Sequence, residues 1–155
     1  GNHDEHTATL LGMILRATYK DNPRVEVHAS PNPYWYYKIG KVMLCSTHGD
    51  GPKIADIPRI MATDEKEMWG QTEYKVCIIG HWHHRQSVDV NGVDVHIAPT
   101  LAPNDAHHHA KGYRASKKMM AVMYDINWGS EGTVEVTEQY AKHATAKKVE
   151  NKINK

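Results

Sequence analysis

The chain has 155 residues, of which 24% are charged and 40% apolar, the composition of one globular domain. Its 19 basic and 18 acidic side chains give a formal net charge of +1, which provides no global electrostatic footprint for nucleic acid. No apolar run approaches the roughly 18 residues that cross a bilayer, and we expect neither a signal peptide nor a membrane partner. Because there are only two cysteines, Cys45 and Cys77, we expect buried, reduced thiols and a cytoplasmic protein.

Regular spacing of apolar residues in the first half of the chain predicts a helix followed by strands. Leu10, Leu11, Ile14 and Leu15 lie at helical spacing. Pro58 has to lie near the start of a helix or interrupt one, because proline cannot continue the helical hydrogen bonds. The expected elements are a helix over 5–20, a short strand over 25–28, strands over 34–39 and 41–47 forming a hairpin, a loop over 48–52 and a mostly helical segment over 53–69.

The second half of the chain is dominated by predicted strands. Asn91 and Gly92 separate two alternating stretches, which is the strongest short signal for a β-hairpin. The expected elements are a strand over 74–79, a loop over 80–84, strands over 86–90 and 93–98, a long His-rich connection over 99–115, strands over 118–126 and 133–137, and a polar, Lys-rich tail over 138–155 that is helical or frayed. Strands outnumber helices, so the sequence predicts a sheet-based α/β layered domain.

Three short segments contain the residue types of a metal site: Gly1–Asp4, Thr47–Asp50 and Gly80–His83. Each is a weak signal when taken alone. Together they are specific, because two of them directly follow apolar strands, one directly precedes a helix, and ligands gather at strand exits in α/β sheets. The chain also has 12 histidines, and histidine is the commonest metal-ligating side chain.

In order and spacing these segments resemble the second half of the signature of the calcineurin-like metallophosphoesterases. The resemblance covers residues 1–137 and implies the C-terminal half of a layered α-β-β-α sandwich with mixed sheets. Asp4, the fourth residue of the first segment, is similar to the nuclease and phosphodiesterase branches rather than to the protein phosphatases.

The resemblance implies a site for two divalent transition metals, drawn from Mn, Fe, Zn or Ni. Asn2, His48 and His81 are similar to ligands of the second metal, and His83 is similar to a ligand of the first. Imidazole and amide-oxygen ligands together suit these ions better than Mg or Ca. If residues 80–83 are extended, His81 and His83 lie two apart and direct both rings to one side.

The resemblance also implies the reaction, which is hydrolysis of a phosphodiester or phosphomonoester by a metal-bridging hydroxide. His3 is similar to the general acid that protonates the leaving-group oxygen. Asp4 would hold His3 and favour its protonated form, since a neighbouring carboxylate opposes the effect of two cations.

The chain departs from the family in lacking the upstream Asp-any-His and Gly-Asp motifs, which supply three protein ligands. Asp50 follows Gly49 but comes after His48, so we interpret it as a loop residue outside the first coordination shell. A complete site therefore requires a separate N-terminal half of the domain as a partner, and without that half the chain is expected to expose apolar strand edges. The alternative function is a catalytically incompetent metal-binding or interaction module that complements that half. A structural domain with coincidental motifs is the third reading.

The candidate substrate-binding residues lie in the long connection over 99–115: His107, His108, Tyr113 and Arg114. They would contact a phosphoester substrate, with nucleic acid or a nucleotide among the candidates. For residues 107–109 a solvated loop is the preferred interpretation. The aromatic strand over 34–39 is expected to pack in the core rather than to stack on bases.

Overall fold

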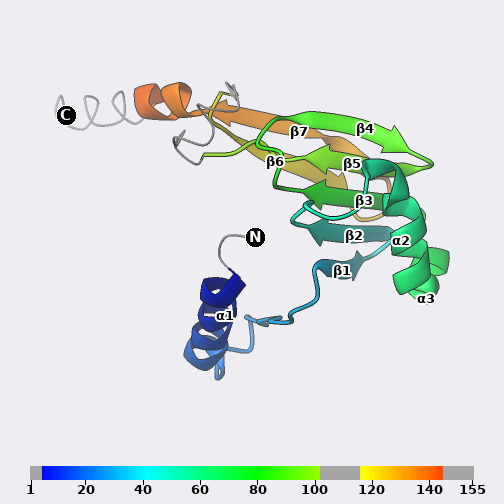
Figure 1. The fold of residues 1–155 in the computed structure, drawn as a ribbon, viewed down its shortest axis with the longest axis horizontal. Helices are drawn as coiled ribbons and strands as arrows, with labels where there is room; N and C mark the ends of the chain where they lie inside the picture. The colour runs from blue at the N-terminus through cyan, green and yellow to red at the C-terminus, as the bar shows by residue number, and fades with distance from the viewer. Residues whose placement is uncertain (1–4, 102–115, 145–155) are drawn as a thin grey trace.

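A computed structural model describes residues 5–101 and 116–144 of the chain as a mixed α/β structure (Figure 1). The elements are α1 (Glu5–Tyr19), β1 (Tyr34–Ile39), β2 (Val42–Thr47), the 3-10 helix η1 (Ile54–Asp56), α2 (Ile57–Asp64), α3 (Lys66–Gln71), β3 (Tyr74–Ile79), β4 (Gln86–Val90), β5 (Val93–Ile97), β6 (Lys118–Asp125) and β7 (Gly129–Thr137). Residues 138–144 continue as a helix.

The main sheet has five strands in the order β1-β2-β3-β5-β4. The three central strands are parallel, and Cys45 of β2 pairs with Cys77 of β3, which pairs with Val95 of β5. The outer strands β1 and β4 are antiparallel to their neighbours. Because the central strands are parallel, their carboxyl ends meet at one edge of the sheet, at Thr47, Ile79 and Ile97.

One face of this sheet forms the hydrophobic core with the helices that follow β2. Alternate residues of β2, β3 and β5 point to this face and pack against Ile57 and Met61 of α2, both at most 2% exposed. Pro58 lies in the first turn of α2, where its missing N–H is not needed. Tyr36 of β1 donates a hydrogen bond of 2.8 Å to Asp64, which fixes the end of α2 on the sheet.

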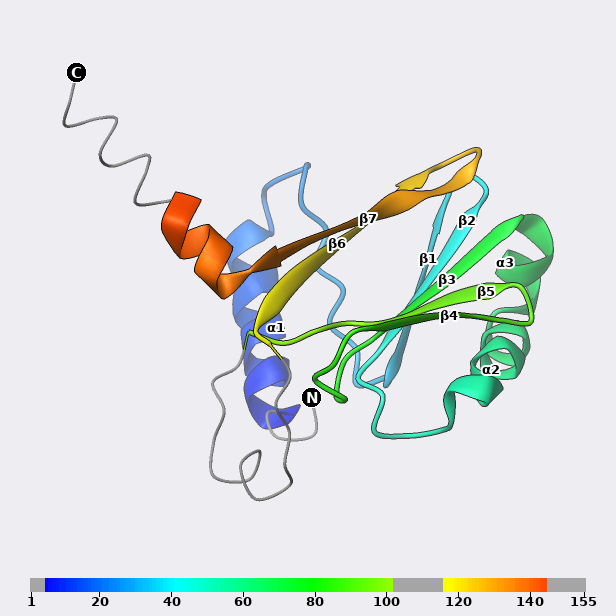
Figure 2. The same ribbon diagram turned by 90° about the horizontal axis from the view of Figure 1, so that it is seen from above.

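The opposite face carries a separate two-stranded sheet, β6–β7 (Figure 2). The Lys41 N–H donates to the Ile126 carbonyl at 2.7 Å. Gly129, the first residue of β7, lies directly against the ring of Tyr74, the first residue of β3. The hairpin is therefore attached at the amino end of the parallel strands, and Glu135 of β7 also forms an ion pair with Arg85, just after the loop that carries His81.

Helix α1 lies away from the sheet in both views (Figures 1 and 2). Its contact within residues 5–101 is with the connecting segment, because Gly12 lies against Ala29 and Arg16 donates to the Ala29 carbonyl at 3.2 Å. Large apolar residues of α1 remain exposed: Leu10, Leu11, Met13, Ile14 and Leu15. In the described part of the chain, no helix has the length and apolar character that a membrane crossing requires.

The aromatic strand over 34–39 packs on the core through Tyr34 and Tyr36 only, whereas Tyr37 on its other face is 53% exposed, so the expectation of core packing holds for one face.

Most predicted elements are confirmed, with two corrections to the secondary structure. Residues 25–28 are not a strand: the chain turns at Asn22, whose carbonyl accepts from the Val25 N–H at 3.1 Å, and no neighbouring strand pairs with this segment. The last strand begins at Gly129 rather than at 133. The preceding turn is short because the Asp125 carboxylate accepts hydrogen bonds from the backbone N–H groups of Asn127 and Trp128. Cys45 and Cys77 are free and buried, as expected.

Candidate metal centre

The candidate site lies at the carboxyl edge of the parallel strands, where the chain leaves β2 and β3. Thr47 and Ile79 are the paired last residues of these strands. The Gly80 N–H continues the ladder by donating to the Thr47 carbonyl at 3.3 Å. His48 therefore follows one strand and His81 follows the next, and both lie at the same edge.

The imidazoles of His48 and His81 come into direct contact there. His81 Nδ1 lies 3.1 Å from His48 Nε2. The ring centroids are 4.9 Å apart and the ring planes make an angle of 77°. With metal–nitrogen bonds of about 2.0–2.1 Å, nitrogens 3.1 Å apart subtend roughly 100° at a shared ion, which suits tetrahedral or octahedral coordination. In the structure this contact is a hydrogen bond in which one ring N–H donates to the other ring nitrogen, and an ion shared by both nitrogens would take the place of that proton.

A glycine allows this close approach. Gly49 has φ +98°, and a Cβ there would collide with the Ile79 side chain. A Cβ on Gly80 would lie 3.4 Å from the carbonyl oxygen of His48. The close approach of the Thr47–Asp50 and Gly80–His83 segments therefore depends on the missing side chain at Gly49, whereas a Cβ on Gly80 would make an ordinary contact.

The Gly80–His83 segment is part of a loop, as predicted, and within it the backbone makes a tight turn. His81 and His83 have φ of 57° and 55°, in the left-handed region. The Trp82 N–H donates to the Gly80 carbonyl at 2.6 Å. The condition under which His81 and His83 would direct both rings to one side, an extended backbone, is therefore not met. Left-handed backbone at residues other than glycine carries a cost of about 1–3 kcal/mol each and clusters at functional sites.

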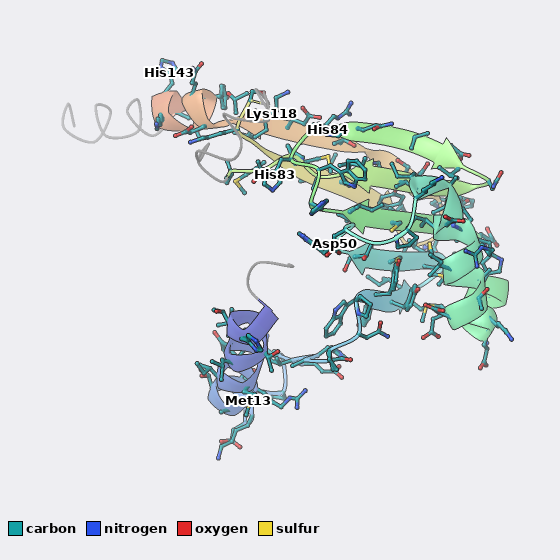
Figure 3. All side chains as sticks on the ribbon, in the orientation of Figure 1. Met13, Asp50, His83, His84, Lys118 and His143 are labelled. Atoms are coloured by element: carbon teal, nitrogen blue, oxygen red, sulfur yellow. The ribbon has the colours of Figure 1, made fainter. Side chains whose placement is uncertain are left out.

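The other described candidates lie at the same edge. Asp50 follows β2 and His83 follows β3, and both are labelled in Figure 3 together with His84, the residue after His83. Asp50 is an exposed loop residue, as expected. His84 donates from Nδ1 to the Trp82 carbonyl at 3.0 Å and so helps to hold the turn. Among residues 5–101 and 116–144, no three His, Cys, Asp or Glu side chains form a group that could hold an ion, so His48 and His81 are an incomplete pair.

The remaining predicted site residues lie outside the described part of the chain. These are the predicted ligand Asn2, the predicted acid His3 with Asp4, and the predicted substrate-binding residues His107, His108, Tyr113 and Arg114.

A buried polar network on the hairpin side of the sheet was not predicted. His96 is 7% exposed, and its Nε2 lies 3.0 Å from the Tyr124 hydroxyl, which donates to Asp94 at 3.1 Å. Because the tyrosine proton goes to Asp94, the proton shared with His96 belongs to Nε2. The Ser87 hydroxyl then donates to His96 Nδ1 at 3.0 Å. Burial lowers the pKa of His96, and Arg85 lowers it further while Asp94 raises it.

One sequence signal could have indicated the contact between Ser87 and His96. The Asn91-Gly92 turn fixes a two-residue hairpin, and its register places Ser87 opposite His96. Nothing local indicates Tyr124, which is 28 positions further along the chain.

No known protein family, no curated protein and no solved structure matches this chain.

Proposed function

We propose that this chain forms part of a metal-dependent phosphoesterase that hydrolyses a phosphodiester or a phosphomonoester. The observation that supports this proposal best is the 3.1 Å approach of the His48 and His81 ring nitrogens at the exits of two neighbouring parallel strands. The turn that carries His81 has left-handed backbone, which costs free energy of folding. Such strain is found more often at functional sites than in loops that only connect strands.

In this proposal the chain's own residues have separate roles. His48, His81 and Asn2 hold one divalent transition metal, and His83 holds a second. Mn, Fe, Zn or Ni would suit these ligands. When bound, the ions would polarise the phosphoryl group and lower the pKa of a water. His3 gives a proton to the leaving-group oxygen, and Asp4 keeps His3 protonated.

A complete site in this proposal also requires the N-terminal half of a layered α-β-β-α domain. Two exposed apolar surfaces support such a partner. One is the face of α1, where Leu11 and Ile14 are 52% and 61% exposed. The other is the face of β1 that points away from α2, where Tyr37 is 53% exposed. A further layer covering both surfaces would remove them from water.

These same surfaces favour the second candidate function, a metal-binding interaction module without turnover of its own. In that case the chain contributes His48 and His81 but hydrolyses nothing until the N-terminal half joins it. Both functions predict that the chain binds a metal ion. Only the first predicts that the isolated chain hydrolyses a phosphoester.

Metal binding by variants tests the shared premise. Mn²⁺ and Zn²⁺ are titrated calorimetrically into the wild type and into His48→Gln, His81→Gln and His28→Gln. Loss of a direct ligand should weaken binding by on the order of 100-fold, at least as much as loss of a residue that only supports a ligand. His28, which pairs with Glu26 at 3.1 Å on the connecting segment, is the control and should bind like the wild type. Equal affinity in all four proteins would exclude both functions.

Hydrolysis of bis-p-nitrophenyl phosphate then separates the two candidates. Metal-dependent turnover by the isolated chain supports the enzyme. Metal binding without turnover supports the interaction module, and adding an N-terminal half that carries the upstream motifs should then restore activity.

A further inference from the structure

Trp82 lies in the same tight turn as His81, and it is 47% exposed. Its ring is perpendicular to its two histidine neighbours, at 86° and 6.1 Å from His81 and at 81° and 6.3 Å from His84. Neither imidazole therefore stacks in parallel on the indole.

The backbone of Trp82 is held in place on both sides. Its backbone N–H donates to the Gly80 carbonyl at 2.6 Å, and its own carbonyl accepts from His84 at 3.0 Å. The indole nitrogen lies beside Gly49, 3.5 Å from the position a Cβ would take there. The indole thus borders both loops that bring His48 and His81 together.

A single exposed apolar residue on a protein surface is common and does not by itself indicate a binding site. Trp82 differs in that its backbone is fixed by hydrogen bonds on both sides and its ring borders the candidate ligands. An aromatic ring carried on a fixed backbone is a platform on which a flat group can stack.

We propose that Trp82 stacks on an aromatic part of the substrate, so that the phosphoester is a nucleotide or a strand of nucleic acid with its base on the indole. This inference rests on the proposed function, because it assigns the substrate class of the same site. The near-neutral charge of the chain does not oppose it, since stacking on a base needs no basic surface.

The test compares two phosphate ligands that differ in the base. Adenosine 5′-monophosphate and ribose 5-phosphate are titrated calorimetrically into the Mn²⁺-loaded chain. The wild type should bind the adenosine compound on the order of tenfold more tightly. In Trp82→Ala this ratio should fall to about one, and in Trp82→Tyr, which keeps an aromatic ring, part of the ratio should remain.

The matched control is Trp128→Ala. Trp128 is 78% exposed in the turn before Gly129, which lies against Tyr74 at the opposite end of the strands. This variant should keep the wild-type ratio, and circular dichroism should show that all variants are folded. Equal binding of the two ligands by the wild type, or an unchanged ratio in Trp82→Ala, overturns the inference alone. If neither ligand shows Mn²⁺-dependent binding, the proposed function is overturned and the inference with it.

Discussion

Gly129 lies so close to Tyr74 that a Cβ on the glycine would come within 2.6 Å of the tyrosine ring. This contact joins the β6–β7 hairpin to the first residue of β3. Gly129 also has φ +84°, a conformation that other residues rarely adopt. The close packing of the two sheets therefore depends on a missing side chain.

Replacing this glycine should destabilise the protein. Gly129→Ala should lower the free energy of unfolding by about 1–3 kcal/mol through both strain and overpacking. Gly92→Ala is the control, because Gly92 has φ +80° but no atom within 4 Å of the position of a Cβ. Urea unfolding followed by circular dichroism measures both. Equal losses in the two variants would show that contact with Tyr74 contributes nothing.

The proposed general acid predicts a dependence on the leaving group. His3→Asn should strongly reduce hydrolysis of esters with poor leaving groups, because these require a proton on the departing oxygen. Esters of p-nitrophenol, whose anion leaves without a proton, should be affected much less. Metal binding, measured by calorimetry, should stay as in the wild type. A uniform loss for all leaving groups would assign His3 to another role.

His96 predicts a pH dependence of stability that is independent of the metal site. Burial lowers its pKa below the ordinary value of 6.5, so the folded state disfavours the protonated ring. As pH falls below about 6.5, the unfolded chain binds the proton first, and folding stability decreases until the pH reaches the lower, folded pKa. A single group contributes at most about 1.4 kcal/mol per pH unit.

Urea unfolding between pH 7.5 and 5 in the presence of a chelator measures this slope. His96→Gln cannot take up the proton and should show a flatter profile than the wild type. His28→Gln, which changes an exposed histidine, should keep the wild-type slope. The assignment is wrong if His96→Gln and the wild type lose stability in parallel.

The burial of the two cysteines predicts that their thiols react with a reagent only when the protein unfolds. Cys45 and Cys77 are paired residues of β2 and β3, and both are fully buried. A hydrogen bond to Cys77 and burial both raise the pKa of Cys45, so its thiol stays protonated at neutral pH. A disulfide-exchange reagent such as Ellman's should find no fast-reacting thiol in the native chain and two in guanidinium. Fast modification of the folded protein would contradict this burial.

The sequence predicts the main sheet well because its signals are local. The Asn91-Gly92 turn and the alternating residues around it specify β4 and β5 without help from the rest of the chain. Pro58 marks the start of α2 in the same way. The segment 25–28 shows the limit, because apolar residues form a strand only where another strand can pair with them, and pairing is decided by the tertiary structure.

The candidate site is predictable in part. The order of the motifs places His48 and His81 at neighbouring strand exits, and the structure brings them together. The left-handed backbone of His81 and His83 could not be predicted, because it results from packing between two loops that lie over thirty positions apart. The Tyr124 hydroxyl on His96 is likewise a contact between separate sheets.

Helix α1 has one more consequence. A helix of 15 residues whose apolar face is left in water is only marginally stable, since most helical stability in proteins comes from packing. Its backbone amides should therefore exchange their hydrogens with solvent quickly, while those of β3 exchange slowly. Protection of the α1 amides would then be a direct signal that a second polypeptide has covered the helix.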